Sequence, residues 1–242
     1  MGSLRNTAAL IGSPRLGRLL KHARGAGLET LLCYRRLAML VAAAEHGANL
    51  EGSAVEFGTF RGGSAGVLAQ VLKPTGKILH VLDSFEGLPP PTDHDNFHQT
   101  GDFKETAFEV VRDGLLKISS AVRVHRGYFE VTLDAIREER FCVAHIDVDL
   151  YESVRECLEF TYPRMAPGGI ILLDDYGART CLGAKAATDE FLSTRPERIH
   201  HLTGAQHGIW VGRPGEDLFD HLRRRSGWTG NLPVLGAKMF RR

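Results

Sequence analysis

Two pairs of acidic residues, each directly after a buried-strand pattern, constrain the fold of this chain most strongly. Asp147 and Asp149 follow the apolar run FCVAHI, and Asp174 and Asp175 follow the run IILL. The segment between the pairs has the length of a helix and ends at a Pro-Gly-Gly sequence. A strand, a crossover helix and a second strand form a right-handed βαβ unit, and both strands then end at the same edge of a parallel sheet. We therefore expect all four carboxylates to lie together at that edge.

This edge is where open α/β folds bind their ligands. Carboxylates gathered there repel one another and raise one another's pKa values unless a cation neutralises them. Oxygen ligands with no nearby Cys or His suit a hard ion, Mg²⁺ before Ca²⁺ or Mn²⁺. The sequence therefore predicts a metal site next to a ligand pocket.

Length and composition favour one α/β domain. The chain has 242 residues, of which 43% are hydrophobic, and its formal net charge is +1. No apolar run approaches the roughly 18 residues of a membrane span, and we find no signal-peptide pattern. The basic residues of the first 36 positions and of the C-terminal tail are not interleaved with aromatic residues. They favour solvated faces or subunit contacts in a homo-oligomer over a nucleic-acid partner.

The cysteines indicate the cellular compartment. They are far apart and form no CxxC motif, which is typical of reduced thiols in a cytoplasmic protein. The four are Cys33, Cys142, Cys157 and Cys181.

Hydrophobic periodicity predicts a helical region followed by a sheet. Leucines at helical spacing indicate helices around Leu16 to Leu20 and Leu28 to Leu32, and the strongest helix from Tyr34 to His46. We expect residues 1–50 to form a helical cover or oligomer contact, residues 51–213 the core, and residues 214–242 a tail. The expected strands are 54–58, 77–82, 122–125, 141–146 and 170–173, with a closing hairpin of 199–202 and 207–211. The expected helices of the core are 65–72, 103–118, 130–140 and 184–193. This alternation predicts a doubly wound, mostly parallel sheet.

A loop rich in Pro, His and Asp runs from Ser84 to about Gly101. Structureless loops of this length are uncommon in compact domains and are usually functional. We expect this one to be a lid over the substrate.

The first strand ends in a glycine-rich turn, VEFGTFRGGSA, that leads into a helix. Its glycines do not match the GxGxxG dinucleotide motif, and it lacks the Lys-Ser/Thr of a P-loop. Glu56 lies two residues before the turn, and Arg61 within it can bind a carboxylate or a phosphate. Asp83 ends the next strand, where an acidic residue binds ribose hydroxyls. These features predict a nucleoside cofactor.

Four motifs in order and spacing, VEFGTFRGGSA, LDSFEGLP, HIDVDLYES and PGGIILLDDYG, resemble the macrocin O-methyltransferase (TylF) family. The resemblance runs from about Tyr34 to Trp210. It implies a Rossmann-like, class I enzyme that uses S-adenosylmethionine and Mg²⁺ to methylate hydroxyls, often on sugars of natural products. It also implies a seven-stranded sheet whose last strand is antiparallel.

The resemblance further implies that Glu56, Gly58 and the following turn hold the methionine part of the cofactor, that Asp83 holds the ribose, and that Asp147, Asp174 and Asp175 hold the metal. Tyr128 and Phe129 either flank the adenine or fill the core. The full set of cofactor-binding candidates is Glu56, Gly58, Thr59, Phe60, Arg61, Gly62, Ser64, Asp83, Ser84, Tyr128 and Phe129.

Methylation of an alcohol needs a base, because a neutral hydroxyl attacks a sulfonium poorly. Asp147 is the first candidate and Asp149 the rival, although Asp149 can instead cap the helix that starts near Glu152. His145 lies inside an apolar strand and is expected to be a core histidine.

Three classes of function remain open from the sequence. The favoured one is an O-methyltransferase acting on a small molecule, either a sugar hydroxyl of a glycosylated natural product or a catechol-like phenol. The second is a nucleotide-dependent oxidoreductase, which the glycine spacing disfavours. The third is a non-catalytic scaffold, which has no reason to keep an electrostatically costly acidic cluster.

Overall fold

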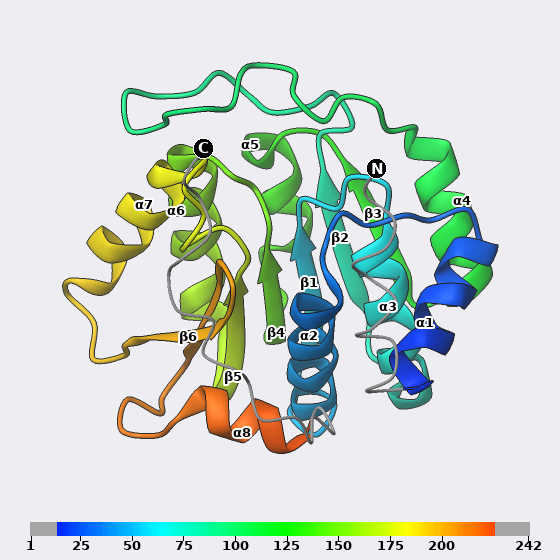
Figure 1. Ribbon diagram of the computed structural model, residues 1–242. Helices are drawn as coiled ribbons and strands as arrows, with labels where there is room; N and C mark the ends of the chain where they lie inside the picture. Colours follow the sequence, from blue (N-terminus) through cyan, green and yellow to red (C-terminus); the bar gives the residue numbers. More distant parts are fainter. Residues whose placement is uncertain (1–13, 226–242) are drawn as a thin grey trace, which may run out of the picture.

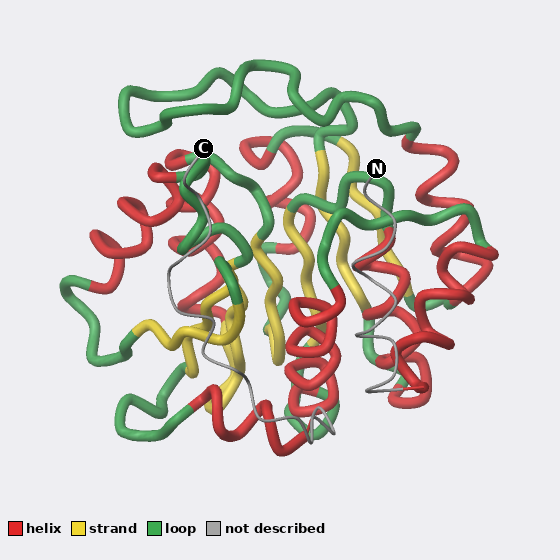
Figure 2. Tube along the Cα trace, in the orientation of Figure 1, coloured by secondary structure: helices red, strands yellow, loops and turns green. Residues whose placement is uncertain are grey.

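Seven strands form one sheet in the order β3-β2-β1-β4-β5-β7-β6, within residues 14–225, which the computed structural model describes (Figures 1 and 2). The first five strands pair in parallel, and β7 runs antiparallel to both β5 and β6. The strands are β1 (Ser53–Phe57), β2 (Leu79–Asp83), β3 (Val122–Arg126), β4 (Phe141–Ile146), β5 (Met165–Leu173), β6 (Ile199–Thr203) and β7 (Gln206–Trp210). The expected mostly parallel sheet with a reversed last strand is confirmed.

Helices cover both faces of the sheet (Figure 2). One face packs against α1 (Pro14–Gly25), α2 (Tyr34–Gly47), α3 (Gly63–Leu72), α4 (Phe108–Ile118) and α8 (Leu218–Arg225). The other packs against α5 (Phe129–Thr132), α6 (Tyr151–Thr161) and α7 (Leu182–Leu192). Three short 3₁₀ helices complete the set: η2 (Lys73–Thr75), η3 (Leu133–Ile136) and η4 (Tyr162–Arg164).

The central strands are buried on both sides, which is why they are continuous apolar runs rather than alternating patterns. In β1, Ala54 belongs to the core under α2 and α3, whereas Val55 and Phe57 belong to the core under α5 and α6. Glu56 therefore shares the α2 side of the sheet with Ala54, and its partner across the ladder is His145 of β4.

The predicted second N-terminal helix is wrong. Residues 26–33 connect α1 to α2 without helical structure, and Gly27 has a φ of +85°. Leu28 is fully buried, whereas Leu31 is 72% exposed. The segment is an extended connection anchored by Leu28, because Gly25 and Gly27 end α1 before a new turn can form.

Three boundaries in the core also differ from the expectation. The helix expected from residue 103 begins at Phe108 as α4, so the preceding loop extends over residues 84–107. The helix expected over 130–140 is a short α5 followed by η3, and it ends at Ile136. β5 begins at Met165, five residues before the expected start, and runs through the Pro-Gly-Gly sequence with an irregular register against β4.

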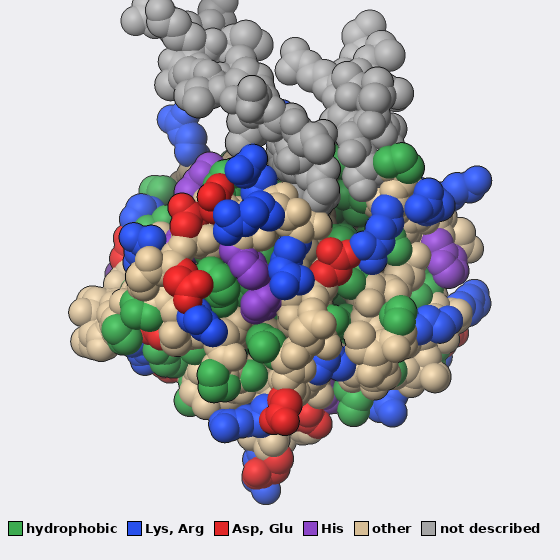
Figure 3. Space-filling model, turned by 90° about the horizontal axis from the view of Figure 1, so that it is seen from below, with side chains coloured by type: hydrophobic (Ala, Val, Ile, Leu, Met, Phe, Trp, Pro, Cys, Tyr) green, Lys and Arg blue, Asp and Glu red, His purple; other side chains and the backbone are tan. Residues whose placement is uncertain are grey.

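The 84–107 loop crosses the top of the molecule in Figure 1, above the ends of the strands. The opposite end, seen in Figure 3, carries Lys or Arg side chains close to Asp or Glu side chains. Within residues 14–225, no helix is long and apolar enough to cross a membrane. Of the predicted tail, residues 214–225 are described, and Leu218 and Leu222 of α8 are buried against the sheet. Residues 1–13 and 226–242 lie outside the described part.

Candidate functional site

A cavity of about 410 Å³ opens at the carboxyl ends of the parallel strands. Its floor comes from the turn after β1, the end of β2, the segment after β3, and the acidic pairs after β4 and β5. The 84–107 loop and the connection between α1 and α2 form its rim. Most predicted site residues line it: Gly58, Thr59, Phe60, Ser64, Asp83, Ser84, Tyr128, Phe129, Asp147, Asp149, Asp174 and Asp175. The fold thus brings together residues that are more than a hundred positions apart.

The glycine-rich turn is held against its neighbours by the geometry of Gly58. This residue has a φ of +74°, and a Cβ there would lie 2.0 Å from the carbonyl oxygen of Asp147. Only glycine lets the end of β1 approach the end of β4 so closely. The turn and the first acidic pair are therefore in direct backbone contact.

Asp83 ties the same turn to the end of β2. Its Oδ2 accepts hydrogen bonds from the backbone N–H groups of Thr59, at 2.8 Å, and Phe60, at 3.1 Å. Its Oδ1 accepts one from the N–H of Phe85 at 2.8 Å. Burial raises the pKa of Asp83, although these three N–H groups act in the opposite direction. The carboxylate shapes the turn and still faces the cavity with lone pairs to spare.

Glu56 lies beneath the turn and does not line the cavity. Its carboxylate is fully buried and accepts a hydrogen bond from Thr59 Oγ1 at 2.7 Å. Its other oxygen lies 2.9 Å from His145 Nδ1. Burial alone would lower the pKa of His145, but Asp174 and Glu56 raise it well above its usual value. His145 is thus a core histidine, and the neighbouring carboxylates favour its protonated form.

Two other residues of the turn face away from the cavity. Arg61 pairs at the surface with Glu29, at 2.9 Å, and its guanidinium stacks over the ring of Phe60. Gly62 has a φ of +74°, and a Cβ there would lie 2.8 Å from Val111 Cγ1. Gly62 serves the packing of α3 against α4.

Asp147, Asp174 and Asp175 form a compact oxygen cluster. One carboxylate oxygen from each lies within 4.8 Å of the others. Asp174 is fully buried; Arg36 Nη1 donates to its Oδ2, and Gln206 Nε2 donates to its Oδ1 at 2.9 Å. Arg36 comes from α2 and Gln206 from β7, so Asp174 is held by a helix that covers the sheet and by the strand next to β5.

The cluster carries more negative charge than its partners neutralise. Burial, followed by repulsion from Asp174 and Asp175, raises the pKa of Asp147 well above its usual value. Burial and the neighbouring Asp149 and Asp174 do the same to Asp175. A hard divalent cation is the charge and donor match for three such carboxylates.

Asp149 does not cap a helix. The N–H of Tyr151, in the first turn of α6, bonds instead to Asp95 Oδ1 of the 84–107 loop at 2.9 Å. Asp149 has a φ of 59°, its N–H donates to Asp175 Oδ2 at 3.2 Å, and its Oδ1 accepts from Cys181 Sγ at 3.3 Å. Its side chain is therefore part of the acidic site.

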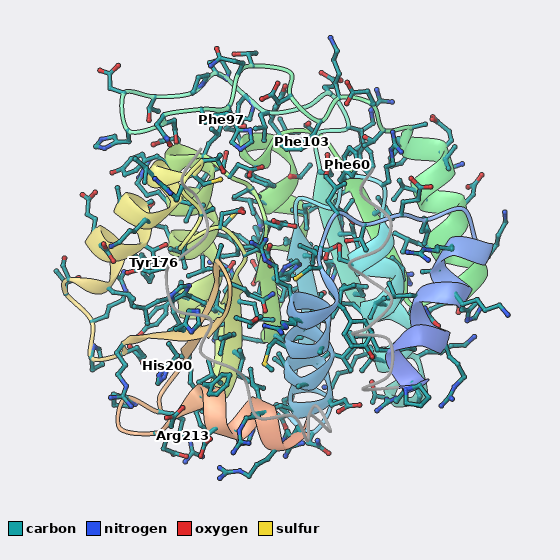
Figure 4. The ribbon with its side chains drawn as sticks, in the orientation of Figure 1. Phe60, Phe97, Phe103, Tyr176, His200 and Arg213 are labelled. Carbon is teal, nitrogen blue, oxygen red and sulfur yellow. The ribbon has the colours of Figure 1, made fainter. Side chains whose placement is uncertain are left out.

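The 84–107 loop is fastened to the two helices that follow the acidic pairs. Asp95 caps α6, and Asn96 Oδ1 accepts the N–H of Leu182 at the start of α7, at 3.1 Å. Phe103 of the loop meets Phe60 of the glycine-rich turn edge to face, with ring centroids 5.8 Å apart (Figure 4). The loop therefore contacts both the glycine-rich turn and the helices next to the acidic pairs.

Gly183 offers a test of this fastening, because a Cβ there would lie 2.0 Å from Asp95 Oδ1 and 2.9 Å from Tyr151 Cβ. We expect Gly183→Ala to displace Asp95 from the first turn of α6 and to increase amide hydrogen exchange in the 84–107 loop at least as much as Asp95→Ala does. Adding Gly183→Ala to Asp95→Ala should change loop exchange much less than Gly183→Ala alone, because the main clash is gone. Fully additive effects in this cycle, measured by mass spectrometry, would contradict the fastening.

Two residues that hold Asp174 escaped the sequence analysis. Arg36 belonged to a basic segment interpreted as a solvated face, yet it stands one helical turn before the buried Leu40 and so on the inward face of α2. A basic residue on the otherwise apolar face of this helix was the signal that could have identified Arg36. Gln206 had no signal, because its contact with Asp174 depends on how β7 inserts beside β5.

Comparison with known proteins supports the interpretation of these motifs. The model of the macrocin O-methyltransferase (TylF) family matches residues 25–200. A relative from Streptomyces olivaceus, an 8-demethyl-8-(2,3-dimethoxy-alpha-L-rhamnosyl)-tetracenomycin-C 4'-O-methyltransferase, is 34% identical over 146 residues. A mycinamicin III 3''-O-methyltransferase from Micromonospora griseorubida is 33% identical over 147 residues. The matched segments cover 55% and 54% of this chain and 56% and 57% of these relatives, so the chain spans about half of their length.

Solved structures share the fold. The O-methyltransferase NovP superposes with a TM-score of 0.69 at 23% identity, covering 84% of this chain and all of NovP. The calicheamicin methyltransferase CalS11 superposes with a TM-score of 0.68 at 17% identity, covering 83% of this chain and 94% of CalS11. The family model spans well over half of the chain, from the end of α1 to the start of β6. This chain belongs to the macrocin O-methyltransferase (TylF) family.

Proposed function

We propose that this protein is an S-adenosylmethionine- and Mg²⁺-dependent O-methyltransferase that methylates a sugar hydroxyl of a glycosylated natural product. One observation carries the proposal: the carboxylates of Asp147, Asp174 and Asp175 share a cavity with the glycine-rich turn after β1. Membership of the TylF family and the names of the two relatives support the reaction class and the kind of acceptor.

The cofactor candidates divide the cavity into regions. The turn formed by Gly58, Thr59 and Phe60 would bind the methionine part of the cofactor. Glu56 lies beneath this turn and supports it. Asp83 and Ser84 stand at the end of β2 for the ribose, and the aromatic rings of Tyr128 and Phe129 flank the adenine. The many acidic side chains on this floor favour a ligand that carries a positive sulfonium. In this assignment Arg61 and Gly62 act on the shape of the turn.

Asp147, Asp174 and Asp175 would hold Mg²⁺, which when bound polarises an acceptor hydroxyl and lowers its pKa. Asp149 is the preferred proton acceptor, because its carboxylate lines the cavity and is not engaged as a helix cap. Asp147 remains the alternative base. Arg36 and Gln206 orient Asp174, and the 84–107 loop, acting as the lid, keeps water from the reacting groups.

The rim of the cavity supports a glycoside as the acceptor. Leu31, Leu32, Leu88 and Phe103 present apolar surface there, well suited to an aglycone, while the sugar reaches the carboxylates. A catechol-like phenol is the alternative acceptor, since adjacent oxygens also suit a metal. The family match disfavours the hypothesis that the protein is a nucleotide-dependent oxidoreductase.

Binding of the cofactor product tests the proposal without an acceptor. Calorimetry with S-adenosylhomocysteine should give micromolar affinity, and NADH should give no heat of binding. A second titration with Mg²⁺ should show a site that EDTA abolishes. Binding of NADH without binding of S-adenosylhomocysteine would reject the methyltransferase. Turnover of a deoxyhexose glycoside but not of a catechol would then establish the acceptor class, and the reverse result would select the phenol.

Two further expectations accompany this function. The four cysteines are free thiols, which fits a reducing compartment such as the cytoplasm. A homo-oligomer stays a prediction.

A further inference from the structure

A second cluster of potential metal ligands lies beside the acidic site, and no sequence motif links its residues. His98 comes from the 84–107 loop, Asp149 from the turn after β4, and Cys181 from the residue before α7. Their donor atoms, one from each side chain, all lie within 4.8 Å of one another. This corrects the expectation that neither Cys nor His lies near the acidic pairs.

Two of the three distances between donor atoms match those of a tetrahedral coordination shell. His98 Nε2 lies 3.5 Å from Asp149 Oδ1, and Cys181 Sγ lies 3.3 Å from the same oxygen. Zinc bonds of about 2.0–2.3 Å to N, O and S place neighbouring donors about 3.3–3.7 Å apart at tetrahedral angles. Asp149 thus stands at ligand spacing from both His98 and Cys181, and the three side chains come from three separate segments.

The surroundings of the cluster match those of a metal centre as well. The other ring nitrogen of His98, Nδ1, lies 3.3 Å from Asp102 Oδ2, the carboxylate–histidine arrangement that orients metal-binding imidazoles. Burial and the nearby carboxylates of Asp175 and Asp149 raise the pKa of the Cys181 thiol, so a bound cation must displace its proton. The His98 side chain is 10% exposed and that of Asp149 is 18% exposed, so the donors are sheltered from solvent.

We infer that His98, Asp149 and Cys181 form a binding site for a borderline-soft divalent cation such as Zn²⁺, separate from the all-oxygen cluster of Asp147, Asp174 and Asp175. The mixed N, O and S donor set selects Zn²⁺ or Co²⁺ over Mg²⁺. Binding releases the thiol proton of Cys181 to solvent and involves no redox change. The ion would join the 84–107 loop to the core and engage Asp149, so Zn²⁺ should inhibit the reaction proposed above.

Cobalt substitution tests the site without cofactor or acceptor, and hence independently of the proposed function. One equivalent of Co²⁺ should produce a thiolate-to-metal charge-transfer absorption that Zn²⁺ removes. Cys181→Ser and His98→Gln should each abolish it. The matched controls Cys33→Ser, at an exposed thiol, and His94→Gln, in the same loop, should keep it.

Two more variants separate this site from its neighbours. Asp174→Asn should keep the cobalt band, because Asp174 belongs to the oxygen cluster. Asp102→Asn should weaken Zn²⁺ binding about 10- to 100-fold, the usual effect of losing the carboxylate behind a metal-binding histidine. Absence of the band in the wild-type protein, or an unchanged band in folded Cys181→Ser, would overturn the inference. If circular dichroism shows Cys181→Ser unfolded, an unchanged band in His98→Gln overturns it equally.

Discussion

Asp174→Asn is expected to lower Mg²⁺ affinity and turnover together, each by about 100-fold or more. Loss of a residue that only supports a metal ligand typically costs about 10- to 100-fold, and Asp174 is itself a ligand in the proposed site. The exchange preserves shape but removes one charge from the oxygen cluster. It also places an amide NH₂ between two donors, Arg36 Nη1 and Gln206 Nε2, so at least one donor loses its acceptor. Calorimetry with Mg²⁺ and a methyl-transfer assay measure the two losses.

In Asp174→Asn, the free energy of unfolding should change by less than the free energy that is lost in Mg²⁺ binding and turnover. Loss of the pair with Arg36 destabilises the fold, but relief of the repulsion that raises the pKa values of Asp147 and Asp175 acts in the opposite direction. The control is Asp189→Asn on α7, an exposed carboxylate that pairs with Lys185 outside the cavity. Normal Mg²⁺ binding and turnover in Asp174→Asn would rule out the metal-dependent mechanism.

Gly58→Ala is expected to destabilise the protein by about 2–5 kcal/mol, from about 1–2 for the left-handed backbone and about 1–3 for overpacking. The added methyl would meet the carbonyl oxygen of Asp147 at 2.0 Å, and a backbone atom cannot yield as a flexible side chain does. Separation of β1 from β4 would also disturb the glycine-rich turn, to which we assign the methionine part of the cofactor. Urea unfolding and S-adenosylhomocysteine titration measure the two effects.

Gly76→Ala isolates the backbone contribution. Gly76 has a φ of +71°, nearly that of Gly58, but a Cβ there has no neighbouring atom within 4 Å. This variant should lose only about 1–2 kcal/mol and should bind S-adenosylhomocysteine normally. Equal losses in the two variants would show that the close approach of β1 to β4 is not critical.

The parallel strands could be predicted because their signals are local. Each apolar run in β4 and β5 ends at an acidic pair, and the strands are buried on both faces. The helix predicted around Leu28 was wrong although its leucines have helical spacing. Tertiary packing, and not a helix, determines that Leu28 is buried and Leu31 exposed. The start of β5 was missed because a Pro-Gly-Gly sequence normally ends an element, whereas here the register irregularity accommodates it.

The site was predictable to the extent that its residues sit at strand ends. Asp147 and Asp174 follow adjacent strands of one βαβ unit, so topology alone brings them together. The meeting of His98 with Asp149 and Cys181 depends instead on the path of a loop without regular structure. No periodicity in the sequence encodes such a path.

The two helix caps supplied by the 84–107 loop have a consequence for how often the cavity is accessible. If the loop must lift to admit an acceptor, the first turns of α6 and α7 lose Asp95 and Asn96 at the same moment. At about 1 kcal/mol for each cap, the open population falls about 30-fold relative to an unfastened loop. The apparent affinity for an acceptor that enters only the open form falls by the same factor. Sequence changes at Asp95 and Asn96 would therefore tune acceptor exchange without touching any group that takes part in the chemistry.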